Sequence, residues 1–181
     1  MLDASEHLHL AIHASQNGDH HAALNYLNTA LEQEPNHAGA RYFRAAEHAE
    51  LGLLERAHTG MIEALELQPG MDIARFQLGL LSLQLSKTDD AHHAFDFLQR
   101  TSQETSLREF SGAYLALLND NTQEAIVKLT QGLSDCPNAA LKADMNRVLA
   151  SLSDTLPDVN GGTIAEPAVF LGAYRDTFET P

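Results

Sequence analysis

The sequence predicts an all-α protein made of four helix-turn-helix repeats and one capping helix. The first observation is a period of 34 residues, at which Ala23 is followed by Ala57, Ala91 and Ala125. The second is that the other repeating positions are also small or apolar, and the third is that Gly or Pro interrupts the helical pattern near the middle and end of most repeats. A period of this length is typical of stacked helical arrays.

Four units follow one another without insertion or deletion, at residues 4–37, 38–71, 72–105 and 106–139. In the first unit, Gly18-Asp19 ends one helical pattern and Pro35-Asn36 ends the next. Small residues let two helices cross closely, and larger apolar residues fill the space beside them. The other positions that repeat in this way are Ala11, Ala45, Gly79 and Ala113; Leu27, Met61, Phe95 and Leu129; and Ala30, Ala64, Leu98 and Gly132.

These residues resemble the tetratricopeptide repeat (TPR) superfamily, whose unit has the same length, the same small and large apolar positions and a late proline. The resemblance covers residues 4–139 and implies a right-handed solenoid that binds proteins and has no enzymatic activity. The third unit departs from the pattern, because Ser86 replaces the turn glycine and Gln103 replaces the proline. Two aromatic positions of the family are also replaced in every unit, by His7, Arg41, Arg75 and Glu109 and by Ala14, His48, Ser82 and Ala116.

A capping helix is predicted at residues 140–153, with Asn138 as its N-cap. The last helix pair of an array leaves an apolar face exposed, which a terminal helix with one polar side can cover. Its apolar side is Leu141, Met145, Val148, Leu149 and Leu152, and its polar side is Lys142, Asp144, Asn146 and Arg147. The repeat domain is therefore expected to span residues 1–154.

Residues 155–181 are predicted to be a linker, with Pro157 and Gly161-Gly162, followed by an apolar tail. The apolar residues of the tail are Val169, Phe170, Leu171, Tyr174 and Phe178. We hypothesise that this tail is a ligand for an apolar groove, either of the same molecule or of a second copy. The alternative is a short helix packed on the cap or on the convex side.

In the family, the first helix of each unit lines a concave groove, and the matching residues here are aromatic or aliphatic. Spacings of three and four residues place them on one side of each helix. Such a surface suits an extended or helical peptide with apolar anchors. The alternative is that these residues pack against neighbouring helices. The predicted groove residues are Leu8, Ile12, Tyr42, Ala46, Phe76, Leu80, Leu83, Phe110, Tyr114 and Leu117.

Charge makes several partners improbable. The 25 acidic residues exceed the 11 Lys and Arg, for a net charge of −14, so nucleic acid and anionic membrane are not expected as partners. Cys136 is the single cysteine, which fits a reducing compartment and a buried thiol. The N-terminus has no basic signal region and no run is long enough to span a membrane, so a cytoplasmic protein is expected.

The ten histidines raise a metal hypothesis, above all for His9 and His13, four residues apart. Spacing alone is weak evidence, because a zinc site needs three or four converging ligands and no HExxH motif or cysteine cluster is present. No cofactor, metal or catalytic site is therefore predicted. Arg41 and Arg75 recur one repeat apart and are interpreted as partners of surface glutamates such as Glu47, with acidic groups of a partner as the alternative.

The leading functional prediction is a cytoplasmic adaptor, scaffold or chaperone-like protein that holds an apolar client segment. The first alternative is a structural protein that assembles with copies of itself through the tail. The second, a histidine-based metal protein, has less support from the sequence.

Overall fold

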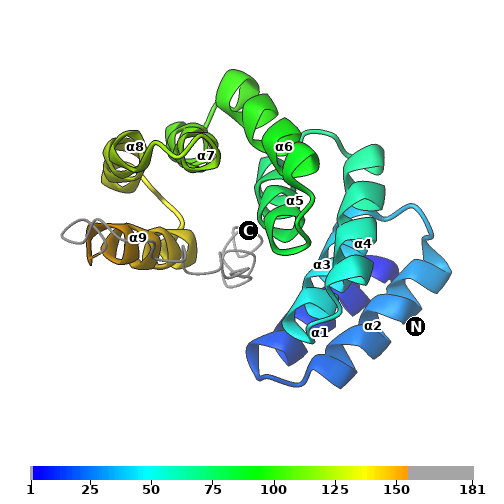
Figure 1. Cartoon of the computed structure of the whole chain (residues 1–181). Coiled ribbons are helices and arrows are strands. Elements are labelled where there is room, and N and C mark those ends of the chain that lie inside the picture. The colour runs from blue at the N-terminus through cyan, green and yellow to red at the C-terminus, as the bar shows by residue number, and fades with distance from the viewer. Residues whose placement is uncertain (1, 155–181) are drawn as a thin grey trace. The chain divides into compact units, whose positions relative to one another are not determined.

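The computed structural model describes residues 2–154, in which all regular secondary structure is helical (Figure 1). This confirms the predicted all-α class. Within this range, each predicted unit holds two helices, except that α7 begins one residue before the predicted boundary at Ser106. The helices are α1 (Ala4–Gln16), α2 (His20–Gln33), α3 (Ala38–Glu50), α4 (Leu54–Leu67), α5 (Asp72–Gln84), α6 (Thr88–Thr101), α7 (Thr105–Leu118), α8 (Thr122–Ser134) and α9 (Ala139–Asp154).

The chain divides into two compact units after Ala74, within α5. In the first unit, α1 packs on α2 and α3 packs on α4, as Figure 1 shows, while α2 also contacts α3. In the second unit, α7 packs on α6 and α8, and α8 also contacts α9. α2 and α8 thus each contact the helix before and the helix after them in the sequence, as helices of a repeat array do.

The turn between the two helices of a repeat has the same backbone conformation in all four units. Gly18 and Gly52 have φ of +76° and +74°, and Ser86 and Asp120 occupy the equivalent places with φ of +57° and +56°. In each turn, the amide that follows donates to the carbonyl five residues earlier, at 2.8 to 2.9 Å. The third and fourth repeats therefore make this turn without glycine, although a left-handed conformation is unfavourable for residues with a Cβ.

Several helices begin with a side-chain N-cap. The Asp3 carboxylate accepts from the Glu6 amide at 2.8 Å, while the Glu6 side chain accepts from the Asp3 amide. This reciprocal pair satisfies two amides that the first turn leaves unbonded. The Asn138 side chain accepts from the Leu141 amide at 2.9 Å, which confirms Asn138 as the cap of α9.

The residues that repeat every 34 positions form the core. The four alanines that reveal it, from Ala23 to Ala125, have no exposed surface. The large apolar residues of the same register are at most 1% exposed. The predicted close crossings are also present, because a Cβ added to Gly60 would lie 2.9 Å from the Ala45 Cβ. The repeated small residues are thus explained by helix packing.

The capping helix differs from the prediction at one residue. Leu141, Met145 and Leu152 are buried as expected, but Asp144, assigned to the polar side, is only 4% exposed. Its carboxylate is bonded to Arg147, one turn further along α9. The assignment of Asp144 to the exposed side was therefore wrong. The predicted tail lies outside the described residues.

Candidate functional site

The ten predicted groove residues differ in their accessibility. Leu83 on α5 and Leu117 on α7 are partly exposed, whereas the other eight are buried. A buried side chain has packing partners already, so the packing role that we weighed as the alternative holds at these eight positions. Whether any of the ten contacts a partner stays a prediction. The buried residues are Leu8, Ile12, Tyr42, Ala46, Phe76, Leu80, Phe110 and Tyr114.

In the second unit, the buried aromatic groove residues Phe76, Phe110 and Tyr114 belong to an aromatic cluster. The Phe76 ring on α5 lies with its centroid 5.6 Å from Phe95, 6.5 Å from Phe110 and 5.8 Å from Tyr114. The Phe95 ring stacks on Tyr114, with centroids 5.0 Å apart. These separations lie in the range that is favourable for aromatic pairs. The cluster joins α5, α6 and α7, so a charge introduced into it would disrupt the core.

In the first unit, the predicted groove residues of α1 and α3 are buried as well. Tyr42 is 1% exposed, and its ring packs edge-on against Phe43, with centroids 5.3 Å apart. Leu8 and Ile12 are 6% and 9% exposed. Leu8, Ile12 and Tyr42, together with Ala46, which is 5% exposed, therefore contribute to the core of the first unit.

Leu83 and Leu117 occupy the same place in the third and fourth repeats, one period apart. Leu83 follows Phe76 by seven residues, and Leu117 follows Phe110 by seven, so each lies two turns along the same face of its helix. Both are partly exposed. They are the predicted groove residues that the described structure leaves accessible to a partner.

Buried polar groups also lie on α7 and α9. The Tyr114 hydroxyl and the Asp144 Oδ2 atom are both buried and without a hydrogen-bond partner within the described range. Burial, and to a smaller extent the charge of Asp144, raises the pKa of Tyr114. Burial also raises the pKa of Asp144, although Arg147 opposes this shift. The burial of Asp144 could not be predicted from the sequence, because a carboxylate and an arginine three residues apart on a helix, such as Asp144 and Arg147, are usually exposed.

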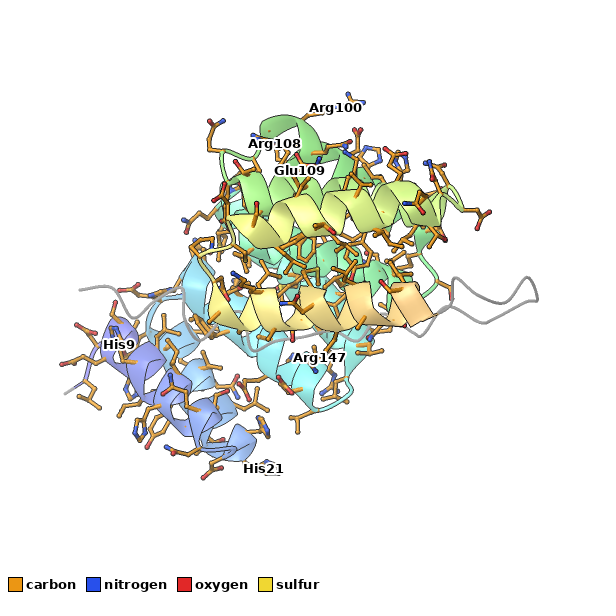
Figure 2. The ribbon with its side chains drawn as sticks, turned by 90° about the vertical axis from the view of Figure 1, so that its left-hand side faces the viewer. His9, His21, Arg100, Arg108, Glu109 and Arg147 are labelled. Carbon is orange, nitrogen blue, oxygen red and sulfur yellow. The ribbon has the colours of Figure 1, made fainter. Side chains whose placement is uncertain are left out.

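The histidines are dispersed. Figure 2 shows His9 on α1 and His21 on α2 well apart at the edge of the first unit. The His13 ring contacts Asn17, and His20 bonds to the Glu47 carboxylate at 2.8 Å. In residues 2–154, no three His, Cys, Asp or Glu side chains gather in a way that could hold a metal ion.

Arg41 and Arg75 both have partners within the fold. Arg41 pairs with a surface glutamate, as predicted, but this is Glu63 at 2.5 Å, whereas Glu47 is buried and bonded to His20. The guanidinium of Arg75 lies over the Phe97 ring, 4.0 Å from its centroid. A glutamate is thus the partner of Arg41, whereas a cation–π contact accompanies Arg75.

Cys136 is buried, as predicted. Burial raises the pKa of its thiol, which lowers the share of the reactive thiolate. Across the described helices, none combines the length and apolar character needed to cross a membrane.

Comparison with protein-family models gives no match, and comparison with curated proteins gives none either. Solved structures are similar in fold. A tetratricopeptide repeat protein from Parabacteroides merdae has a TM-score of 0.66 at 20% identity, over 83% of this chain and 59% of that one. The chain thus spans less than two thirds of that protein.

Two structures of MamA are also similar. A part of MamA from Desulfovibrio magneticus has a TM-score of 0.61 at 15% identity, over 86% of this chain and 97% of that one. A double mutant of MamA has a TM-score of 0.60 at 15% identity, over 96% of this chain and 97% of that one.

Proposed function

We propose that this chain, which has the TPR-like fold, is a non-enzymatic protein-interaction module. In this role it is an adaptor, scaffold or chaperone-like protein that holds an apolar segment of a client along the first helices of its repeats. The observation that carries the proposal is the pair Leu83 and Leu117, which remain partly exposed at equivalent places in successive repeats. Such a spacing suits a segment with repeated apolar anchors.

The energetics favour binding at these positions over binding at the buried ones. Burying a leucine side chain fully contributes about 1.5–3 kcal/mol, of which a partly exposed leucine still has a share to gain. The buried residues of the same faces, such as Phe76 and Phe110, have no surface left to bury. Their role in the proposal is to hold Leu83 and Leu117 in a fixed arrangement, which lowers the entropy lost on binding.

The test compares the partners captured by the wild-type chain with those captured by a Leu83→Glu/Leu117→Glu variant. Its matched control is Leu10→Glu/Val127→Glu, which places the same charges at exposed positions outside the predicted groove. We expect wild type and control to retain the same polypeptides, and the Leu83/Leu117 variant to lose them. Circular dichroism establishes first that all three are folded. Equal capture by all three chains would refute the proposed site.

The predicted tail adds a second, more specific proposal. Residues 163–181 bind the same surface, in cis as a gate or in trans as a link between copies, because five large apolar residues there need a partner. In trans, this makes the chain a self-assembling structural protein. A labelled 163–181 peptide should bind a chain that ends at residue 154, and Leu83→Glu/Leu117→Glu should abolish that binding. Sedimentation of the full chain over a range of concentrations distinguishes cis from trans.

A further inference from the structure

A surface pocket of about 350 Å³ lies in the first unit, where α3 and α4 cross. Its floor is the close contact of Ala45 with Gly60, where an added Cβ would be 2.9 Å from the Ala45 Cβ. The absence of a side chain on Gly60 therefore both lets the helices approach and leaves the pocket open. Its walls carry Arg44 and His48 from α3 and Arg56, Glu55 and Glu63 from α4.

The basic groups of this pocket are unusual in so acidic a chain, which has 11 Lys and Arg against 25 Asp and Glu. Arg44 reaches only the Asn28 side chain, at 3.5 Å, which is a long contact for a hydrogen bond. Over residues 2–154, neither Arg44 nor Arg56 forms an ion pair. Glu63 is already engaged, because Arg41 holds it at 2.5 Å.

The net charge of the pocket favours a ligand with a single negative charge. Among the lining residues, Arg44 and Arg56 carry two positive charges and Glu55 and Glu63 carry two negative ones. Arg41, which does not line the pocket, already neutralises Glu63, so an excess of about one positive charge remains when His48 is neutral. A carboxylate carries one negative charge and matches the planar donors of a guanidinium. A phosphate, with a charge nearer to two, would exceed this single positive charge.

We propose that this pocket binds a carboxylate, namely that of a glutamate or aspartate side chain in a partner polypeptide, between Arg44 and Arg56. The choice of a polypeptide rests on the interaction role proposed above, while binding of the carboxylate group does not. The pocket involves α3 and α4 and is separate from the Leu83 and Leu117 positions, so it adds a polar contact to an apolar one.

His48 provides a spectroscopic reporter of this binding. Burial, then the charges of Arg44 and Arg56, lowers the pKa of His48, and Glu47 opposes the shift. The other charged groups near it are Glu55 and Glu63 on the pocket wall, and His20 of α2, which bonds to Glu47. A bound carboxylate places a negative charge beside His48 and must raise its pKa. By linkage, the affinity for the carboxylate then increases as the pH falls through the pKa of His48.

The experiment follows the His48 ring signals of the full chain by NMR during titration with acetate, with inorganic phosphate, and with two blocked five-residue peptides that differ in a central Glu or Gln. We expect saturable shifts with acetate and with the Glu peptide, a raised pKa of His48 in the complex, and no shift with the Gln peptide. Arg44→Gln and Arg56→Gln should each weaken binding about tenfold. Arg100→Gln, which removes an exposed arginine on α6, is the matched control and should leave binding unchanged.

Each other outcome contradicts a part of the proposal. Absence of saturation with acetate would refute the carboxylate site. Tighter binding of phosphate than of acetate would refute the choice of ligand. Binding of acetate without binding of the Glu peptide would refute the polypeptide partner. The Leu83→Glu/Leu117→Glu variant should bind the Glu peptide as wild type does, so failure of the groove and failure of this pocket are distinguishable.

Discussion

The Phe95 ring occupies the space that a side chain on Gly79 would take. A Cβ built on Gly79 would lie 2.6 Å from two atoms of that ring. The other repeats have alanine at the place of Gly79, combined with Leu27, Met61 or Leu129 at the place of Phe95. The third repeat thus lacks a methyl group on α5 and has a larger side chain on α6 that fills the same space. Gly79 and Phe95 therefore form one packing unit.

Gly79→Ala should lower the free energy of unfolding by about 1–2 kcal/mol, because the strain of overpacking exceeds the gain in helix propensity. Phe95→Leu in the same chain should recover part of this loss, since Leu occupies the equivalent place in two other repeats. Chemical denaturation of the double-mutant cycle measures the coupling. Gly70→Ala is the control, because no atom lies within 4 Å of its added Cβ. Additive effects of the two core substitutions would contradict the account.

Ser86→Gly should stabilise the protein by up to about 1 kcal/mol. Ser86 has φ of +57°, which is unfavourable for a residue with a Cβ, and glycine removes this strain at the expense of a larger entropy loss on folding. The converse substitution, Gly52→Ser at the equivalent turn, should destabilise by a similar amount. Thermal unfolding of both variants measures these two stability changes. A loss of stability in Ser86→Gly would show that the Ser86 hydroxyl stabilises the turn.

Asp144→Asn should stabilise the protein at neutral pH and less so at acidic pH. Burial raises the pKa of Asp144 in the folded state, so the charged form is unfavourable above that pKa. This penalty falls away as the pH drops towards the ordinary value of an aspartate, about 3.9, because the folded state takes up the proton first. Loss of the bond to Arg147 matters little, since Arg147 is 63% exposed.

Denaturation at pH 7 and at pH 4.5 measures the difference for Asp144→Asn. Asp135→Asn, at an exposed position, is its control. An equal effect of Asp144→Asn at both pH values would contradict the role assigned to its charge.

His20→Ala should lower the free energy of unfolding by about 1–3 kcal/mol, because it leaves the buried Glu47 carboxylate without its partner. The neighbouring His21 is exposed, so His21→Ala should change stability by less than about 0.5 kcal/mol. Thermal unfolding of the two variants side by side makes the comparison. Equal effects would mean that the His20–Glu47 bond contributes nothing beyond the surface contacts of a histidine.

Most of the fold could be predicted because its core is periodic. Ala23 and its three equivalents are buried for the same reason in each repeat, so one pattern predicts eight helices of the array. The turn at Ser86 could not be predicted from local propensity, which favours glycine there, because packing of the flanking helices imposes the conformation.

The site was harder to predict than the fold. Helical spacing places Phe76 and Leu83 on one face, but it does not tell which of them is covered by a neighbouring helix. The same holds for Asp144, whose burial depends on contacts far away in the sequence. The pocket of Arg44 and Arg56 joins residues of two helices, and no motif in the sequence marks it.

The central claim, that Leu83 and Leu117 contact a client polypeptide, is tested most directly by photo-crosslinking in the native cell. A photoreactive phenylalanine analogue replaces Leu117 in one chain and Val127, which is 47% exposed on α8, in another. We expect covalent adducts of higher mass from position 117, none from position 127, and loss of the position-117 adducts when Leu83→Glu is added. Adducts from position 127 alone, or adducts that persist with Leu83→Glu, would contradict it.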